Sequence, residues 1–211
     1  MEVSDEDLDA VEQFYAERGC PVQIELCPLT AQDLPARLTR RGYVLQAFEN
    51  ELARPAPAGP VQPPSGADIR VETGGDEALW LHIVSQGFAE PDRPMPGDRT
   101  VPRDAATAIG DVMRQFFHPE LVRYVAYVNG HGAAAAVSFV KDGVFGIYGT
   151  ATLPEFRRRG LQGAIVASAL NDSRGKADVV MATTEPGSIS QRTFERFGFQ
   201  VLYTRAILVK Y

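Results

Sequence analysis

The chain has 211 residues, of which 45% are hydrophobic and 23% charged, and its formal net charge is −6. This composition is enough to bury a full core, as one domain or as one domain with a small appendage, and it excludes a disordered protein. The negative charge is concentrated at the N-terminus, because residues 1–51 hold 11 acidic and 4 basic side chains. No basic face is evident outside Arg157–Arg159, so we expect no nucleic-acid partner.

The N-terminus, the cysteines and the histidines predict a soluble, cytoplasmic protein that binds no metal. The N-terminus is acidic, unlike a signal peptide, and the longest largely apolar stretch, Ala133–Val140, is too short to cross a membrane. Cys20 and Cys27 are expected to be reduced thiols. The three histidines do not have the spacing of metal ligands. We therefore predict neither a membrane partner nor a metal site.

The first 54 residues predict a small α/β unit. Ser4 and Asp7 have the spacing of a capping box before a helix with Leu8, Val11, Phe14 and Tyr15 on one face. The elements that follow are a strand at Val22–Leu26, a helix at Ala31–Arg41 and a strand at Tyr43–Leu52. Because 54 residues make a poor independent core, this piece should pack on the rest of the chain or on another subunit. A homodimer is compatible with this interpretation.

Residues 55–67 contain five prolines and few side chains that can pack. Such a composition is typical of a semi-rigid linker. It divides the chain into an N-terminal extension at 1–54, a proline-rich linker at 55–67 and a main domain at 68–211.

The main domain predicts an α/β fold with a mixed sheet. Asn129-Gly130 and Asp142-Gly143 are strong signals for antiparallel hairpins, and strand–helix alternation follows them. The predicted elements before the last hairpin strand are a strand (Ile69–Glu72), two helices (Glu77–Gly87 and Arg103–Phe117) and two strands (Val122–Val128 and Ala133–Lys141). The later ones are a strand at Val144–Leu153, a helix that opens at Gly160, a strand over Asp178–Glu185, a helix that starts at Ser188 and a closing strand.

The segment Thr150–Ala164 joins a strand to a helix through a glycine-rich turn. The first N–H groups of a helix have no intrahelical acceptor, and glycine lets a ligand approach the backbone closely. This pattern suits an anion such as a diphosphate. An ordinary β–α connection has a similar sequence, so the loop alone leaves both interpretations open.

Two motifs, the loop just described and a later helix, resemble motifs that occur in the same order in the GNAT family of N-acetyltransferases. Arg157-x-x-Gly160 resembles the start of that family's acetyl-CoA loop, although Gln162 stands where a glycine or alanine is usual. The run from Ser190 to Phe199 resembles its last helix, with Phe194, Glu195, Arg196, Gly198 and Phe199 in register. The resemblance covers residues 68–211. It implies a GNAT-like acyltransferase fold with a small N-terminal α/β extension.

The resemblance also implies an activity. Such a protein would use acetyl-CoA as co-substrate, without a metal, and would acetylate a primary amine of a small molecule or peptide by direct attack in a ternary complex. The N-terminal extension would be a partial GNAT-like repeat, because LTRRGYVLQAFENEL is similar to FERFGFQVLYTRAIL. Any α–β corner with a C-capping glycine looks alike, however, so a chance similarity is equally open.

The resemblance also assigns residues in and next to these two motifs to the binding of acetyl-CoA. Pantetheine and the acetyl carbonyl would be held by Ala151, Thr152 and Leu153. The diphosphate would be wrapped by Arg158, Arg159, Gly160, Leu161, Gln162, Gly163 and Ala164, and Ser190 is expected to contribute to coenzyme binding from the last helix.

Two residues are candidates for catalysis. Glu185, at the carboxyl end of its strand, could act as the general base, and Tyr148 could orient a chain of water molecules. Each also has a plain structural interpretation, as an exposed carboxylate before a turn and as a packed strand aromatic.

The sequence departs from the family at Gly187, where asparagine is common, and at Phe194, where tyrosine usually protonates the leaving thiolate. These departures keep a rival open, a non-catalytic acyl-CoA-binding or interaction protein derived from the same fold. A P-loop protein is poorly supported because no G-K-[ST] follows the glycines.

Overall fold

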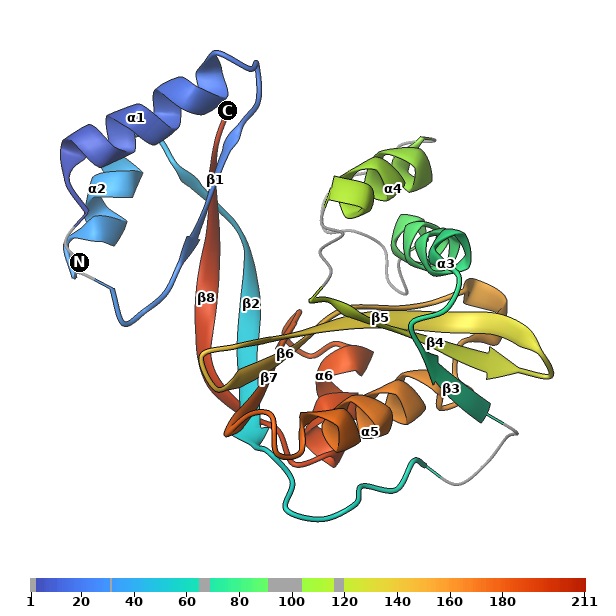
Figure 1. Ribbon diagram of the computed structural model, residues 1–211. Helices are drawn as coiled ribbons and strands as arrows, with labels where there is room; N and C mark the ends of the chain where they lie inside the picture. Colours follow the sequence, from blue (N-terminus) through green and yellow to red (C-terminus); the bar gives the residue numbers. More distant parts are fainter. Residues whose placement is uncertain (1–2, 31, 65–68, 91–103, 116–119) are drawn as a thin grey trace. The chain divides into compact units, whose positions relative to one another are not determined.

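A computed structural model describes residues 3–30, 32–64, 69–90, 104–115 and 120–211. The helices are α1 (Asp5–Ala16), α2 (Leu34–Arg40), α3 (Glu77–Ala89), α4 (Ala105–Gln115), α5 (Leu161–Ser173) and α6 (Ile189–Arg196), with a 3-10 turn η1 at Pro154–Phe156. The strands are β1 (Val22–Leu26), β2 (Val44–Pro55), β3 (Ile69–Thr73), β4 (Val122–Val128), β5 (His131–Lys141), β6 (Val144–Thr152), β7 (Val179–Thr184) and β8 (Gln200–Lys210). Every predicted element is present in the predicted order (Figure 1).

Differences from the predicted bounds are small and have local causes. Helix α2 begins at Leu34 rather than Ala31, with Asp33 as its N-cap and proline in its first turn, where the missing N–H costs nothing. Strand β2 continues to Pro55 instead of ending at Leu52. The predicted ends of the helix at Arg103–Phe117 lie outside the described residues, within which α4 runs from Ala105 to Gln115.

The eight strands are hydrogen-bonded in the order β1-β8-β2-β7-β6-β5-β4-β3. The β3–β4, β4–β5, β5–β6 and β1–β8 pairs are antiparallel, whereas β6–β7 is parallel. The predicted mixed α/β sheet is therefore confirmed. The parallel pair is the β–α–β unit that contains α5.

The chain forms two compact units, and three strands contribute residues to both. Unit 1 consists of Met1–Leu52, Thr183–Gln191 and Val201–Tyr211, and unit 2 consists of Ala53–Ala182 and Arg192–Gln200. The predicted domain limits at 54 and 68 stay a prediction, and each unit is described by itself below.

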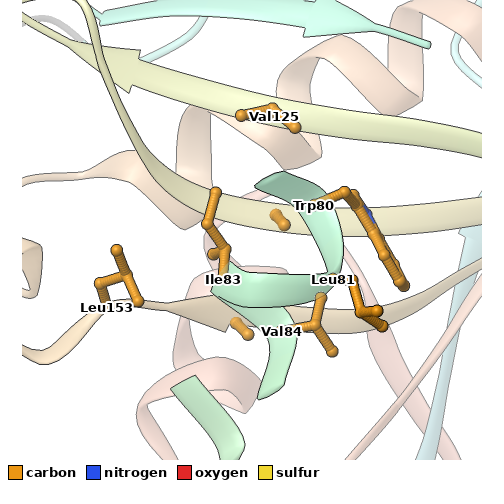
Figure 2. Packing of buried hydrophobic residues seen from close by; sticks show 8 residues of the cluster. Trp80, Leu81, Ile83, Val84, Val125 and Leu153 are labelled. Carbon is orange, nitrogen blue, oxygen red and sulfur yellow. The ribbon is translucent and has the colours of Figure 1, made fainter. Parts of the chain in front are cut away.

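Unit 2 is layered. Helix α3 lies on one face of strands β4–β6 with α4 packed against it, and α5 lies on the other face of strands β3–β6 (Figure 1). Figure 2 shows the core beneath α3, where Trp80, Ile83 and Val84 meet Val125 of β4 and Leu153 after β6. The indole N–H of Trp80 donates to the carbonyl of Ala136 at 2.8 Å. Helix α3 is thus fixed to the sheet by apolar packing and by one buried hydrogen bond.

A buried polar contact joins α5 to the opposite side of this sheet. The hydroxyl of Tyr124 donates to Asp172 at 2.9 Å and lies 3.1 Å from the hydroxyl of Ser138. Burial is the largest influence on this phenol and raises the pKa of Tyr124 well above its usual value. The tyrosine therefore stays neutral and links β4, β5 and α5.

The proline-rich segment is held against α5. The side chain of Asn171 accepts the Val61 N–H and donates to the Val61 carbonyl, both at 2.9 Å. Pro64 lies so close to Gly163 that a Cβ at residue 163 would stand 2.8 Å from the proline ring. Part of the predicted linker is therefore a fixed strap along this helix.

Unit 1 has a small core of its own. A buried cluster is formed by residues of α1, β1, α2 and β8 and by the tyrosine just before β2: Leu8, Val22, Leu34, Leu38, Leu208 and Tyr43. Of the predicted apolar face of α1, Val11 and Phe14 are instead exposed. The predicted capping box is confirmed, because Ser4 and Asp7 exchange side-chain and backbone hydrogen bonds. Cys20 and Cys27 carry free thiols.

Candidate functional site

Strands β6 and β7 separate within unit 2. Their parallel ladder runs from Val144–Val179 to Ile147–Ala182, while β6 continues to Thr152. Directly after the last ladder pair, β6 carries a bulge on its other side, where it pairs with β5. Tyr148 lies opposite Val137 and Ala151 opposite Ala135, so two β6 residues occupy the space of one. A bulge bends a strand and increases its twist, so it redirects the end of β6.

Glycine is required at this bulge. Gly149 has a φ of 58°, in the left-handed region that residues with a Cβ rarely adopt. A glycine also lies under the neighbouring tyrosine, since a Cβ at Gly146 would stand 2.1 Å from the Tyr148 hydroxyl. Tyr148 is 48% exposed, so its ring lies over the strand on an accessible face.

The segment predicted to hold pantetheine is mostly inside the unit. Ala151 and Leu153 are 8% and 7% exposed and belong to the cluster under α3. The Leu153 N–H donates to the Ala133 carbonyl at 3.0 Å. Since these side chains face the core, any contact from Ala151–Leu153 to a ligand would be made mainly by the main chain.

The loop after β6 brings backbone N–H groups to the start of α5. Arg158 has a φ of 64°, and Gly160 is the N-cap with a φ of 81° and no side-chain cap. Apart from the adjoining chain, no atom of the residues that the structure describes lies within 4 Å of the point where a Cβ of residue 160 would stand. Helix α5 therefore begins beside open space, which is the local geometry that anion binding at a helix N-terminus needs.

The side chains of this loop differ in exposure. Leu161 and Ala164 are 2% and 4% exposed and face the core. The Gln162 amide donates to the Thr150 hydroxyl at 3.3 Å and so connects the start of α5 to the end of β6. Arg158 and Arg159 are exposed. Positive charge at the surface thus comes from these two arginines, and the remaining residues offer their main chain.

The first arginine of the motif is used differently. Arg157 Nε donates to the Thr152 carbonyl at 3.2 Å, and its Nη2 donates to the Gly87 carbonyl at 3.1 Å and to the Glu90 carbonyl. Its guanidinium therefore connects the end of β6 to the end of α3.

Glu185 and Ser190 belong to unit 1. Glu185 is exposed and begins a turn in which its carbonyl accepts the Ser188 N–H at 3.1 Å. Proline follows it, and Gly187 has a φ of 71°, which is the residue pattern of a type II turn. Ser188 then caps α6 by accepting the Gln191 N–H at 3.0 Å, and Ser190 is the second residue of that helix.

The position of the family's tyrosine is a core position in this chain. Phe194 is 1% exposed and packs edge to face on Phe199, with 5.0 Å between ring centroids. It offers no proton, and its ring stabilises the end of unit 2 where α6 turns into β8.

Sequence reasoning missed a polar network in unit 1. Arg205 forms ion pairs with Glu25 at 2.8 Å, Glu49 at 2.5 Å and Glu51 at 3.0 Å. The Glu51 carboxylate, in a residue only 6% exposed, also accepts a hydrogen bond from Thr183, the residue after the last β6–β7 ladder pair.

Burial, followed by the Glu51 charge, raises the pKa of Tyr203 above its usual value. No local sequence motif predicts this polar network, because Arg205 and its partners come from four different strands.

None of the helices in the described part of the chain combines the length and apolar character that a membrane crossing needs. In that same part, no group of three or more His, Cys, Asp or Glu side chains is arranged to hold a metal ion.

Known proteins give a consistent picture. The sequence model of the Acetyltransferase (GNAT) family matches residues 88–199. A GCN5-related N-acetyltransferase from Kribbella flavida is 19% identical, with a TM-score of 0.66 over 97% of this chain and 74% of that one. One from Sphaerobacter thermophilus is 16% identical, with a TM-score of 0.67 over 98% and 67%.

A functionally unknown conserved protein from Staphylococcus epidermidis is 13% identical, with a TM-score of 0.67 over 97% of this chain and 78% of that one. At these identities, the solved structures show a shared fold alone. No curated protein matches the chain.

Proposed function

We propose, since the chain belongs to the acetyltransferase (GNAT) family, that it transfers an acetyl group from acetyl-CoA to a primary amine of a small molecule or peptide. One observation carries the proposal. The β6–β7 ladder ends at Ile147–Ala182, and β6 then leads through a bulge into a helix that begins at Gly160 beside open space. A separated strand pair can take an extended chain such as pantetheine, and the helix N-terminus can take its diphosphate.

In this proposal, the diphosphate is bound by main-chain N–H groups from Arg158 to Gly163, with Arg158 and Arg159 supplying positive charge. The Ala164 N–H, also predicted to contribute, instead donates to the Gly160 carbonyl at 3.0 Å. The exposure of both arginines and the absence of a side-chain cap on α5 support the assignment. The strand end Ala151–Leu153 would bind pantetheine, and the acetyl carbonyl would be polarised by a main-chain N–H of Ala151 or Thr152, because the Leu153 N–H already donates to the Ala133 carbonyl. A single well-placed oxyanion donor contributes about 2.7–4 kcal/mol to catalysis.

The amine would attack the thioester carbonyl directly, so that a C–N bond forms and the C–S bond breaks. Glu185 is the proposed base for the proton that the amine loses, and Tyr148 would orient the water that carries it. Phe194 cannot protonate the leaving thiolate, so its proton would come from Ser188, Ser190, Tyr203 or water, or the thiolate would leave without a dedicated acid. A thiol with a pKa of about 8.5, by analogy with cysteine, is a tolerable leaving group without a dedicated acid.

The burial of Phe194 also favours a second candidate, a protein that binds acyl-CoA without catalysis. Turnover separates the two. Release of CoA from acetyl-CoA in the presence of a panel of primary amines supports the enzyme. Tight binding of acetyl-CoA by calorimetry, with no amine-dependent release, supports the binding protein. Absence of binding at millimolar acetyl-CoA would contradict both.

A further inference from the structure

The arginine that opens the loop motif lies within the fold instead of at the surface. Arg157 is partly buried, and its guanidinium donates to three carbonyls, those of Thr152, Gly87 and Glu90. Its neighbours Arg158 and Arg159 are exposed. The three consecutive arginines therefore divide into one partly buried residue that donates to three carbonyls and two exposed residues, of which Arg159 donates only to the nearby Glu155 carbonyl, at 3.1 Å, among the contacts of the described residues.

The carbonyls of Gly87 and Glu90 belong to the end of α3. The last four carbonyls of a helix have no intrahelical partner, and the helix dipole makes this end negative. Glu90 is the C-cap of α3, and the last turn of this helix contains no basic residue of its own. Arg157 supplies hydrogen-bond donors and positive charge to this helix end from a loop about 70 residues further along the chain.

The same helix end lies directly on the end of β6. A Cβ at Gly87 would stand 2.9 Å from the Ala151 Cβ and 3.3 Å from the Thr152 nitrogen, so only glycine permits this approach. Arg157 also holds the Thr152 carbonyl at 3.2 Å. The last turn of α3 and the strand end proposed to hold the thioester are thus fixed to each other by one close backbone contact and one guanidinium.

We propose that Arg157 is a positioning residue that holds the end of α3 against Ala151 and Thr152, and that it does not bind the diphosphate. This inference rests on the proposed function for its effect on catalysis, although the placement of α3 can be measured without any ligand. The two neighbouring arginines therefore have different roles: loss of Arg157 should lower turnover, and loss of Arg158 should weaken coenzyme binding.

The first experiment compares Arg157→Ala with Arg158→Ala. By calorimetry with CoA, we expect the Kd of Arg157→Ala to stay within about threefold of the wild-type value, and that of Arg158→Ala to rise roughly tenfold. With the best amine of the panel, kcat of Arg157→Ala should fall roughly 10–100-fold, because small misplacements at a reacting centre are costly. Equal loss of CoA affinity in both variants would overturn the inference.

The second experiment uses hydrogen exchange and needs no ligand. Amides in the last turn of α3 should lose protection in Arg157→Ala by roughly tenfold, while the start of the helix, fixed by Trp80, keeps its protection. Arg157→Lys restores the charge with a single donor group and should recover part of the protection. Unchanged protection in Arg157→Ala would overturn the inference.

A third variant covers the case in which Arg157→Ala does not fold. Gly87→Ala keeps the arginine but separates α3 from Ala151. It should therefore reproduce both the fall in kcat and the loss of amide protection in the last turn of α3. Wild-type levels of both would overturn the inference. If wild-type protein binds no CoA, the proposed function fails, whereas the exchange measurement still decides whether Arg157 positions α3.

Discussion

Gly160→Glu places a carboxylate and a Cβ where α5 begins. The N-cap has a φ of 81°, and apart from the adjoining chain no atom of the described residues lies within 4 Å of the new Cβ, so the side chain would project into the space proposed for the diphosphate. The substitution therefore changes three things: the backbone becomes strained, the space is filled, and negative charge is added where an anion should bind.

The electrostatic part alone gives a measurable loss. Two unit charges 4 Å apart interact by about 1 kcal/mol in water and by about 4 kcal/mol at an effective dielectric constant of 20. A diphosphate carries two negative charges, so the repulsion is about 2 kcal/mol or more, which corresponds to roughly a 30-fold weaker affinity. Backbone strain adds about 1–3 kcal/mol against folding but does not act on the ligand directly.

Gly175→Glu is the matched control. Gly175 has a φ of 68°, follows the other end of the same helix, and likewise has no described atom within 4 Å of a built Cβ. Isothermal titration calorimetry with acetyl-CoA should show a loss for Gly160→Glu and near wild-type affinity for Gly175→Glu, with both folds checked by circular dichroism. Unchanged affinity in folded Gly160→Glu would refute the diphosphate assignment.

Three further substitutions test other parts of the account. Glu185→Gln should lower kcat/KM by roughly 10²-fold or more and change the pH profile of kcat/KM. The control Glu195→Gln, on the exposed face of α6, should do neither. A Glu185→Gln profile identical to that of wild type would end the assignment of the base. Phe194→Tyr should cost about 1–3 kcal/mol in a denaturant titration, because its hydroxyl enters a buried site, while turnover of the folded enzyme does not fall; a large loss of kcat would contradict this. Hydrogen bonds from Ser4 lower the pKa of Asp7, so this carboxylate stabilises the fold above its ordinary value of 3.8 and ceases to do so as the pH falls through the lowered value. Asp7→Asn should therefore be less stable than wild type at neutral pH, with a difference that shrinks on acidification; a constant difference would disagree.

The order of elements was predictable because its signals are local. Asn129-Gly130 and Asp142-Gly143 fix two hairpins, and both asparagine and aspartate have the positive φ that such turns require. Gly160 opens α5 and Pro186-Gly187 ends β7 for similarly local reasons. These short patterns locate the candidate coenzyme loop without any knowledge of tertiary contacts.

The parts that sequence reasoning missed depend on long-range contacts. The sequence identifies Arg157 as the start of the loop motif but does not show that its guanidinium contacts carbonyls at the end of α3. The strap role of Val61 is set by Asn171, 110 residues away. Glu51 reads as an ordinary strand carboxylate, but Arg205 and Thr183 enclose it. The cytoplasmic location, the oligomeric state and the roles of Glu185 and Tyr148 stay predictions.

Coenzyme A is proposed to bind through its diphosphate to main-chain amides from Arg158 to Gly163. The most direct measurement is a titration of ¹⁵N-labelled protein with CoA, followed by amide chemical shifts. We expect the largest shift changes on Arg158–Ala164, and we expect pantetheine alone, which lacks the diphosphate, not to produce them. Largest changes elsewhere in the chain, or no change at millimolar CoA, would contradict this proposal.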